Sequence, residues 1–253
     1  MSLDHKVSPK GVFLSVIVPA YNEAERLPST LRHLQGYLSK NLYTYEILVV
    51  LDGPTDATLD VLRRMSGEID NLRIIERAVN RGKGYTVREG MLKASGTVRL
   101  FTDADNSTDI THFDKMKPLF DQGYDVAIAS RHPRDASGAR QVVLQARYKR
   151  IAGRFGNAIV QLFAVRGIWD TQCGFKAFRA EAAQRIFARA TIDGWGFDIE
   201  VLALARALNY KTGIIPAHWI NDPHSHVRPF DYVRVLGDML MVWFNFLTRR
   251  YDL

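Results

Sequence analysis

The chain has 253 residues, of which 47% are apolar and 24% charged, a composition typical of a folded globular protein and not of a disordered one. A single cysteine, Cys173, excludes a disulfide framework within the chain and favours a reducing compartment. No stretch reaches the roughly 20 apolar residues of a membrane-spanning helix, and the first residues have no hydrophobic signal core. We therefore expect any contact with a membrane to be peripheral.

The formal net charge is +7 and the pI is about 9.5. A basic excess of this kind fits three classes of partner, namely nucleic acid, an anionic membrane and phosphorylated ligands. It also fits a basic surface that serves only solubility. Composition alone leaves these alternatives open.

The first half of the chain alternates five short apolar runs with segments of helical spacing. This alternation predicts a Rossmann-like α/β fold, a mostly parallel sheet flanked by helices, in which ligands bind beyond the carboxyl ends of the strands. A polar helix start is expected after the first run, at residues 22–25. The predicted strands are Leu14–Ala20, 45–51, Leu72–Glu76, Val98–Thr102 and Val126–Ala129.

The second half is less regular. Arg147–Val165 has the spacing of an amphipathic helix with basic residues beside its apolar face, and residues 174–178 are expected to form a strand. Phe197–Leu208 is predicted to be helical, and Phe230–Arg250 to form a long, very apolar helix. We expect one domain over residues 1–253, divided into a nucleotide-sugar half (11–130), an acceptor half (131–228) and a membrane-proximal C-terminal helix (229–253).

Asp103 and Asp105 give the strongest local signal, because they directly follow the fourth predicted strand. Two carboxylates two residues apart can share one divalent cation, and hard oxygen ligands suit Mg²⁺ or Mn²⁺. Such an ion could neutralise a diphosphate leaving group. The alternative is a pair of aspartates that only caps the next helix.

Two further signals follow neighbouring strands. Asp52 could accept a hydrogen bond from a base or a ribose, or could simply form the turn before Gly53. Arg81 and Lys83 belong to an Arg-Gly-Lys-Gly stretch that opens a helix, where a backbone can approach a phosphate closely. The stretch matches neither a Walker A motif nor Gly-x-Gly-x-x-Gly, which disfavours a P-loop ATPase and a dinucleotide oxidoreductase.

Arg131 follows the fifth predicted strand and could hold a phosphate, or could be a solvated loop charge. Asp198, near a helix start, could act as a general base or could only interact with the helix dipole. His224 could ligate a metal, and His226 and Arg228 could contact a phosphate, although loop residues of these types often do neither. Cys173 has no histidine beside it in the sequence, so we interpret it as structural.

Several motifs resemble those of a known family. PAYNEAERLP from Pro19, VVLDGPTDAT from Val49, NRGKGYTVREG from Asn80 and DAD at Asp103 look like the inverting GT-A glycosyltransferases of family 2. The second half narrows this resemblance. The motifs ASRH from Ala129, DTQCGFK from Asp170 and WGFDIE from Trp195 resemble those of the dolichyl-phosphate β-glucosyltransferases.

The resemblance implies a reaction in which UDP-glucose and a polyprenyl phosphate give polyprenyl phosphate glucose and UDP, with inversion. It implies Mg²⁺ or Mn²⁺ as cofactor. The site residues that we expect from the residue patterns and the resemblance together are Pro19, Tyr21, Glu23, Asp52, Arg81, Lys83, Asp103 and Ala104 around the nucleotide-sugar; Asp103, Asp105 and His224 around the metal; Arg131, His226 and Arg228 around the acceptor phosphate; and Asp103, Asp105, Arg131 and Asp198 in catalysis.

The chain departs from the family pattern at two places. Leu51-Asp52 stands where family members have paired aspartates, and His224-Ser225-His226 where many have Gly-Ser-Lys. Two alternatives within the fold also remain, a GDP-mannose donor and a hydroxyl acceptor that would need a base such as Asp198. A nucleic-acid binder is disfavoured, because carboxylates at the strand ends would repel the nucleic-acid backbone.

The last expectation concerns the membrane. Arg147–Val165 and Phe230–Arg250 are predicted to form an apolar, cation-flanked surface that docks on an anionic bilayer, on its cytoplasmic face. The alternative is that these helices pack on the sheet as core. The residues that recur at helical spacing in the second segment are Met239, Leu240, Trp243, Phe244 and Leu247, followed by Arg249 and Arg250.

Overall fold

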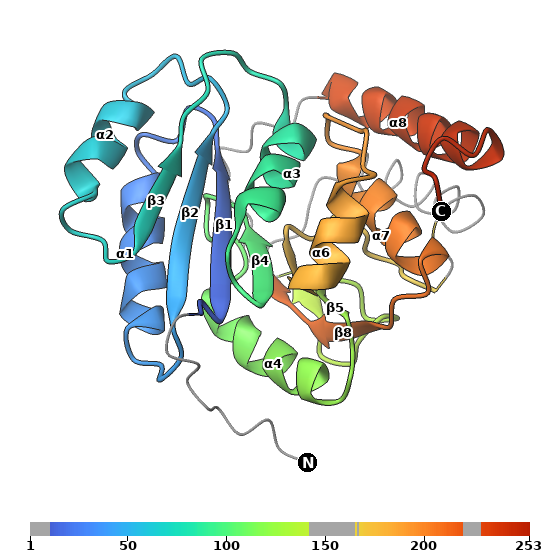
Figure 1. The fold of residues 1–253 in the computed structure, drawn as a ribbon, viewed down its shortest axis with the longest axis horizontal. Helices are drawn as coiled ribbons and strands as arrows, with labels where there is room; N and C mark the ends of the chain where they lie inside the picture. The colour runs from blue at the N-terminus through green and yellow to red at the C-terminus, as the bar shows by residue number, and fades with distance from the viewer. Residues whose placement is uncertain (1–10, 142–164, 166, 220–228) are drawn as a thin grey trace.

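The computed structural model describes residues 11–141, 165, 167–219 and 229–253, and it contains a seven-stranded sheet (Figure 1). All strand pairs are parallel except those of β7, which runs antiparallel to both of its neighbours. The expected mostly parallel sheet is thus confirmed. In spatial order the strands are β3 (Leu72–Ile75), β2 (Tyr45–Leu51), β1 (Leu14–Ala20), β4 (Val98–Thr102), β7 (Phe175–Arg179), β5 (Val126–Ser130) and β8 (Thr212–Pro216).

The two expected halves of the chain share this sheet. The strand expected at residues 174–178 is β7, and it lies between β4 and β5 of the first half. β8, at the edge beside β5, was not predicted from the sequence. A separate pair of short strands, β6 (Arg140–Gln141) and β9 (His218–Trp219), runs parallel.

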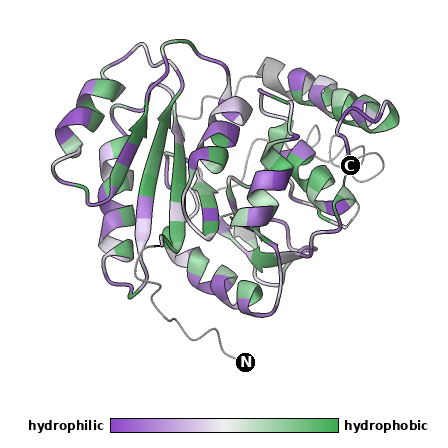
Figure 2. Cartoon of the chain, in the orientation of Figure 1, coloured by the Kyte–Doolittle hydropathy of each residue, from purple (hydrophilic) through white to green (hydrophobic). Residues whose placement is uncertain are grey.

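Helices cover both faces of the sheet, as the alternation of elements predicted (Figure 1). Alternate strand residues point to opposite faces, so Val18 packs with one set of helices and Ile17 with the other. Figure 2 shows the strands as largely apolar and the helices as mixed. The first set contains α1 (Leu27–Leu38), α2 (Thr58–Met65) and α4 (Phe113–Asp121), and the second contains α3 (Lys83–Lys93), α6 (Ala180–Phe187), α7 (Phe197–Ala207) and α8 (Pro229–Leu247).

Two boundaries differ from the expectation. The first helix begins at Leu27 and not at residues 22–25, because Asn22 has a positive φ of 55° and bonds to Thr55 in a turn. The C-terminal helix α8 ends at Leu247 rather than Arg250. Arg147–Val165 lies outside the described residues except for Val165, so its helix stays a prediction. Within the described part of the chain, no helix is long and apolar enough to span a bilayer.

Candidate active site

The carboxyl ends of β1, β2, β4 and β5 meet at one edge of the sheet, because these strands run in the same direction. β7 runs the other way, so its first residue lies at this edge, where Phe175 pairs with Thr102. The edge therefore gathers residues that are far apart in the sequence. Those predicted from the sequence are Pro19, Tyr21, Glu23, Asp52, Asp103, Ala104, Asp105 and Arg131.

A charged cluster lies directly after β4. The ammonium nitrogen of Lys83, the first residue of α3, is 2.5 Å from Oδ1 of Asp103. Burial opposes the charge of Lys83, but Asp103 and Asp198 outweigh it and raise the pKa of this lysine. Burial and the neighbouring Asp103 raise the pKa of Asp105. We call Asp103, Asp105 and Lys83 the open cluster, because the Asp103 side chain is 31% exposed.

Gly174 explains how β7 can approach the open cluster so closely. A Cβ atom at this position would lie 2.0 Å from Oδ2 of Asp103, which is closer than any real contact. With any other residue at this position the Asp103 carboxylate would have to move. The preceding Cys173 is fully buried, and burial raises the pKa of its thiol to about 11. This environment agrees with the structural role expected for Cys173.

Asp52 holds the Arg-Gly-Lys-Gly loop in place. Its carboxylate accepts hydrogen bonds from the backbone N–H groups of Arg81 at 2.8 Å and Gly82 at 2.9 Å, and it pairs with Arg77 at 2.6 Å. The backbone N–H groups of Arg81 and Gly82, which we expected to be available to a phosphate, are thus bonded to the Asp52 carboxylate. Asp52 therefore shapes the start of α3, beside which Lys83 reaches Asp103, and its predicted contact with a base or ribose stays a prediction.

The residues after β1 form the far side of the edge. Glu23 accepts two hydrogen bonds of 2.7 Å from the guanidinium of Arg26, and Tyr21 is 38% exposed. The carbonyl oxygen of Ala104 accepts a hydrogen bond of 2.6 Å from the Thr30 hydroxyl. These contacts fix the loops without covering the Tyr21 ring, which leaves an aromatic surface at the place where a nucleotide was predicted.

Arg131 is engaged in a buried ion pair. Its Nε and Nη2 groups each donate to the Asp170 carboxylate at 2.8 Å, and its backbone N–H donates to the same group at 2.7 Å. Burial would raise the pKa of Asp170, but Arg131 overcomes this effect and lowers the pKa to about 2. This guanidinium was expected to face an acceptor phosphate, but two of its three nitrogens donate hydrogen bonds to Asp170.

Asp198 lies in a second buried ion pair, which sequence reasoning missed. The ammonium of Lys176, on β7, donates to the Asp198 carboxylate and also to the Cys173 carbonyl oxygen at 2.7 Å. Lys176 is fully buried, and the only sequence signal was a lysine inside an apolar strand. Burial raises the pKa of Asp198, although Lys176 and Lys83 oppose it. We call Arg131–Asp170 and Lys176–Asp198 the sealed pairs.

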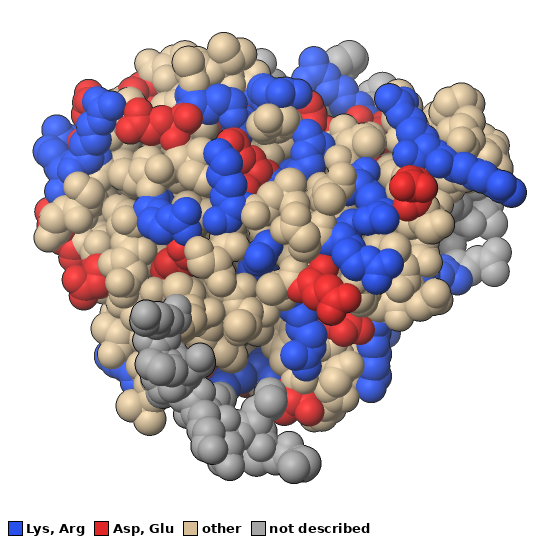
Figure 3. Space-filling model, viewed as in Figure 1, with Lys and Arg blue, Asp and Glu red and all other residues tan. Residues whose placement is uncertain are grey.

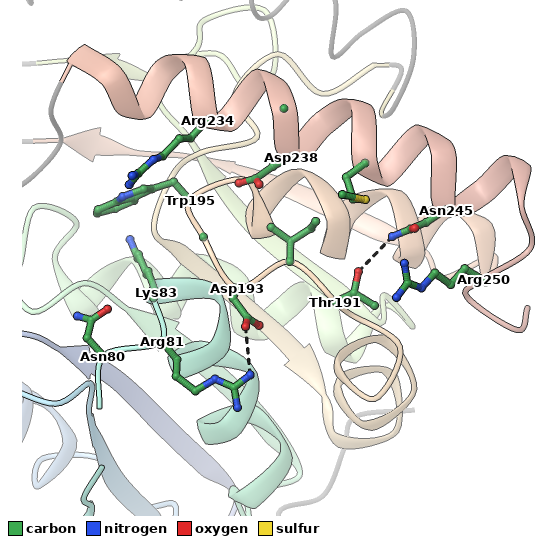
Figure 4. A pocket seen from close by; sticks show the side chains of 15 residues that line it. Asn80, Arg81, Lys83, Thr191, Asp193, Trp195, Arg234, Asp238, Asn245 and Arg250 are labelled. Atoms are coloured by element: carbon green, nitrogen blue, oxygen red, sulfur yellow. Dashed lines mark hydrogen bonds and ion pairs between the residues drawn. The ribbon is translucent and has the colours of Figure 1, made fainter. Parts of the chain in front are cut away.

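The loop at residues 191–196 connects the start of α3 to helix α8. Asp193 accepts hydrogen bonds from Arg81 at 3.3 Å and Arg88 at 2.7 Å. From the other side, Asp238 of α8 accepts a hydrogen bond of 3.0 Å from the backbone N–H of Gly196. These three elements line an open cavity of about 870 Å³, drawn in Figure 4. Lys83 lines this cavity as well as pairing with Asp103, so the cavity adjoins the open cluster.

The remaining predicted residues, His224, His226 and Arg228, lie outside the part of the chain that the structure describes. Among the residues that it does describe, no three or more His, Cys, Asp or Glu side chains are grouped as a metal site. Asp103 and Asp105 could thus supply only part of a coordination shell. Mg²⁺ in proteins is often held in this way, by one or two carboxylates together with substrate phosphates and water.

A family model described as Glycosyl transferase family 2 matches residues 15–187. The chain belongs to this family. The resemblance of its sequence motifs is thereby confirmed, and membership makes the chain a glycosyltransferase. A relative from Drosophila melanogaster, a dolichyl-phosphate β-glucosyltransferase, is 38% identical over 251 residues, which cover 93% of this chain and 76% of that protein.

Solved structures of other proteins share the fold. A mannosyl-3-phosphoglycerate synthase from Rubrobacter xylanophilus superposes with a TM-score of 0.67 at 15% identity, over 96% of this chain and 76% of that one. A glucosyl-3-phosphoglycerate synthase from Mycobacterium tuberculosis, solved with Mn²⁺, UDP and glucosyl-3-phosphoglycerate, has a TM-score of 0.62 at 19% identity, over 96% and 81%. The GT-A fold expected from the sequence is confirmed.

Proposed function

We propose that the chain transfers glucose, with inversion, from UDP-glucose to a polyprenyl phosphate of the dolichyl type at a membrane surface. Glucose and the lipid phosphate are suggested by the relatives, several of which are dolichyl-phosphate β-glucosyltransferases at 30% identity or more. UDP is suggested by the motifs that this chain shares with such enzymes. The neighbour solved with UDP supports the same donor base.

The reaction is one displacement at the anomeric carbon. An oxygen of the acceptor phosphate forms a bond to this carbon from the side opposite the diphosphate, while the bond between the carbon and the diphosphate oxygen breaks. The electron pair of the broken bond leaves with UDP. Because the acceptor oxygen is ionised near neutral pH, no proton has to be removed, and a single displacement inverts the configuration.

The observation that carries the acceptor class is the pairing of Asp198 with Lys176. A hydroxyl acceptor requires a base within hydrogen-bond reach of its proton. Asp198 is the carboxylate that the sequence offered for this task, and it is 4% exposed and bonded to a fully buried ammonium. A carboxylate in this position balances charge and does not take up a proton from a substrate, which fits an acceptor that is already an anion.

A divalent cation, Mg²⁺ or Mn²⁺, belongs to the proposal, and Asp103 and Asp105 would hold it. When bound, such an ion supplies positive charge to the diphosphate as it leaves. The raised pKa of Asp105 marks a partly buried carboxylate that an additional cation would stabilise. Lys83 already contributes one positive charge beside Asp103.

The chain's own residues supply the rest of the arrangement. Tyr21 would stack on or beside the nucleotide, and Asp52 would act through the loop that carries Arg81 and Lys83. Arg131 would meet the acceptor phosphate through Nη1, because Nε and Nη2 donate to Asp170. Further nucleotide contacts are assigned to Pro19, Glu23 and Ala104, and further acceptor or metal contacts to His224, His226 and Arg228.

The membrane surface is assigned to helix α8. Five of its large apolar side chains are between 41% and 61% exposed, whereas the predicted apolar residue Met239 packs inward. Figure 3 shows basic side chains over the end of the molecule that carries α8. An apolar helix face with cations nearby favours the boundary of an anionic bilayer. The free thiol of Cys173 fits the reducing, cytoplasmic side.

The proposal is tested by a panel of nucleotide-sugars, each with and without polyprenyl phosphate in vesicles, with release of the nucleotide as readout. We expect UDP-glucose to give the highest kcat/KM, and its turnover to depend on the lipid phosphate. A higher kcat/KM with GDP-mannose would overturn the donor. Equal or better transfer to a soluble hydroxyl acceptor would overturn the acceptor class.

A further inference from the structure

Helix α8 presents three different faces. Its buried face packs through Met239 and Val242, which are 2% and 1% exposed. A second face lines the cavity beside the open cluster. The residues of this cavity face are Arg234, Gly237, Asp238, Met241 and Asn245, which recur at helical spacing. The third face, which we call the exposed stripe, consists of Leu240, Trp243, Phe244 and Leu247.

The distribution of polarity on α8 is unusual for a helix in water. Polar anchors point inward, where Asp238 binds the backbone of Gly196 and Asn245 binds the Thr191 hydroxyl at 3.2 Å. Large apolar side chains point outward along the exposed stripe. A helix that packs on a core and faces water has the opposite pattern. The exposed stripe therefore suits an apolar medium or an apolar chain.

The cavity itself is suited to an anion. Its described lining includes four cationic residues, Arg81, Lys83, Arg234 and Arg250, but only two carboxylates, Asp193 and Asp238. Three of these cations have a carboxylate neighbour, because Arg81 pairs with Asp193, Lys83 pairs with Asp103 outside the lining, and the charge of Arg234 acts on Asp238. With Asp103 counted, four cations face three carboxylates, so the lining carries a small surplus of positive charge, which a neutral sugar alone would not need.

One end of the cavity leads to the reacting centre. In Figure 4 the side chains of Arg234, Trp195 and Lys83 lie in succession from α8 to α3. The Lys83 ammonium lies 5.2 Å from the centre of the Trp195 ring, and it contacts Asp103 at 2.5 Å. An anion that passes Arg234 and reaches Lys83 therefore arrives beside the Asp103 carboxylate.

The exposed stripe borders the cavity. Because consecutive residues of a helix are turned by about 100°, Gly237 lies between the stripe residue Leu240 and the cavity residue Met241. A Cβ atom at Gly237 would meet no other atom within 4 Å, so this border is open. An elongated molecule could therefore lie on the stripe and turn into the cavity across Gly237.

We propose that this cavity receives the phosphate head of a membrane-held lipid phosphate, with Arg234 and Lys83 as counter-ions, while the lipid chain lies along the exposed stripe. The inference rests on the proposed function, because it assigns a route to that acceptor. It adds a binding site on α8 which is separate from Arg131. It also gives α8 two tasks, contact with the bilayer and guidance of the phosphate.

The first test uses Gly237→Leu, which places a side chain on the border between the exposed stripe and the cavity. We expect the KM for polyprenyl phosphate in vesicles to rise by about tenfold or more, while the KM for UDP-glucose and its slow hydrolysis by water stay unchanged. Gly36→Leu is the matched control, since Gly36 also lies in a helix and a Cβ there meets no atom within 4 Å. It changes helix propensity equally without touching the cavity.

The second test separates the cavity from general attraction to the bilayer. Arg234→Gln removes a charge that lines the cavity, and Arg249→Gln removes an exposed charge just after α8. In neutral detergent micelles, we expect Arg234→Gln to raise the KM for polyprenyl phosphate by about tenfold or more and Arg249→Gln to leave it unchanged. Both variants should lose similar affinity for anionic vesicles.

The outcomes distinguish the two proposals. If the wild type transfers glucose to polyprenyl phosphate but Gly237→Leu and Arg234→Gln behave like their controls, the cavity proposal is overturned and the proposed function stands. If the wild type uses only soluble acceptors, both are overturned. A higher KM for polyprenyl phosphate in both cavity variants, with unchanged hydrolysis of UDP-glucose, would support the cavity as the phosphate site.

Discussion

The open cluster and the sealed pairs contain the same kinds of side chain and differ in what surrounds them. Asp103 meets Lys83 at an edge where 31% of its side chain is exposed, so a ligand can reach it. Asp170 and Asp198 meet Arg131 and Lys176 inside the protein. Replacing the protein partner with a ligand costs little free energy at the open cluster and much more in the sealed pairs. A charge in a motif can therefore exchange its protein partner for a ligand only in the open setting, whereas a sealed charge can bind a ligand only through an atom that its partner leaves unused.

Breaking a sealed pair should have the largest effect. Asp170→Ala leaves the Arg131 charge buried without its partner, so we expect a loss of about 3–5 kcal/mol in the free energy of unfolding. Denaturant titration measures this loss. Tyr37→Phe, which removes only a hydroxyl bonded to the exposed Asp114, is a control that should cost much less. A loss below about 1 kcal/mol would contradict the distinction between sealed and open sites.

The same pair sets a pH dependence. Asp170 has a folded pKa of about 2 and an ordinary value of 3.8, so its contribution to stability is complete above pH 3.8 and is lost as pH falls through 2. The wild type should therefore lose stability more steeply than Asp170→Ala between these values. Parallel acid titration curves for the two proteins would mean that Arg131 does not hold the Asp170 charge.

Breaking the open cluster should affect activity and spare the fold. Asp105→Ala removes a carboxylate from the proposed metal site, and we expect kcat to fall by about 10²–10³-fold, with EDTA having a comparable effect on the wild type. Mn²⁺ binding, followed by electron paramagnetic resonance, should be lost in parallel. Thermal unfolding should change little. Full wild-type activity in EDTA would remove the metal from the account.

Arg131 sharpens the comparison, because the sequence assigned it to the acceptor and the structure places it in a sealed pair. If Nη1 also contacts the acceptor phosphate, Arg131→Ala should weaken acceptor use by about 1.5–3 kcal/mol beyond the loss in Asp170→Ala. Kinetics of both variants, at a temperature where both are folded, measure the difference. Equal acceptor kcat/KM in the two would leave Arg131 with the structural role alone.

The smallest expected effect concerns the bilayer. Trp243→Glu puts a charge on the exposed stripe, and we expect binding to anionic vesicles to fall by roughly tenfold in co-sedimentation. Leu42→Glu is the matched control, since Leu42 is fully exposed in a loop between α1 and β2. If the wild-type protein stays in the supernatant at low salt, a soluble acceptor becomes the better interpretation.

The strand-end residues were predictable from the sequence because short apolar runs and parallel order fix where they lie. Asp103, Asp105 and Lys83 follow elements whose bounds the sequence indicated, and the structure brings them together. Asp52 was placed correctly at the edge, but its bonds to Arg81 and Gly82 depend on a tertiary turn that spacing does not reveal.

Contacts between segments that are far apart in the chain could not be predicted from the sequence. Lys176 and Asp198 are 22 residues apart on β7 and α7, and nothing in either segment names the other as partner. β7 lies between β4 and β5 in the antiparallel direction, which alternation of strands and helices does not predict. The cavity beside α8 likewise arises only from the meeting of three elements.

The central claim is that Asp198 balances a buried charge and is not a base, and replacing its whole pair tests this most directly. In the double variant Lys176→Met, Asp198→Leu both charges disappear together, so the fold should survive although either single change destabilises it. We expect glucose transfer to polyprenyl phosphate within about tenfold of the wild type. If Asp198 were the base for a hydroxyl acceptor, the folded double variant would lose about 10²–10⁴-fold in kcat, and that result would contradict the account.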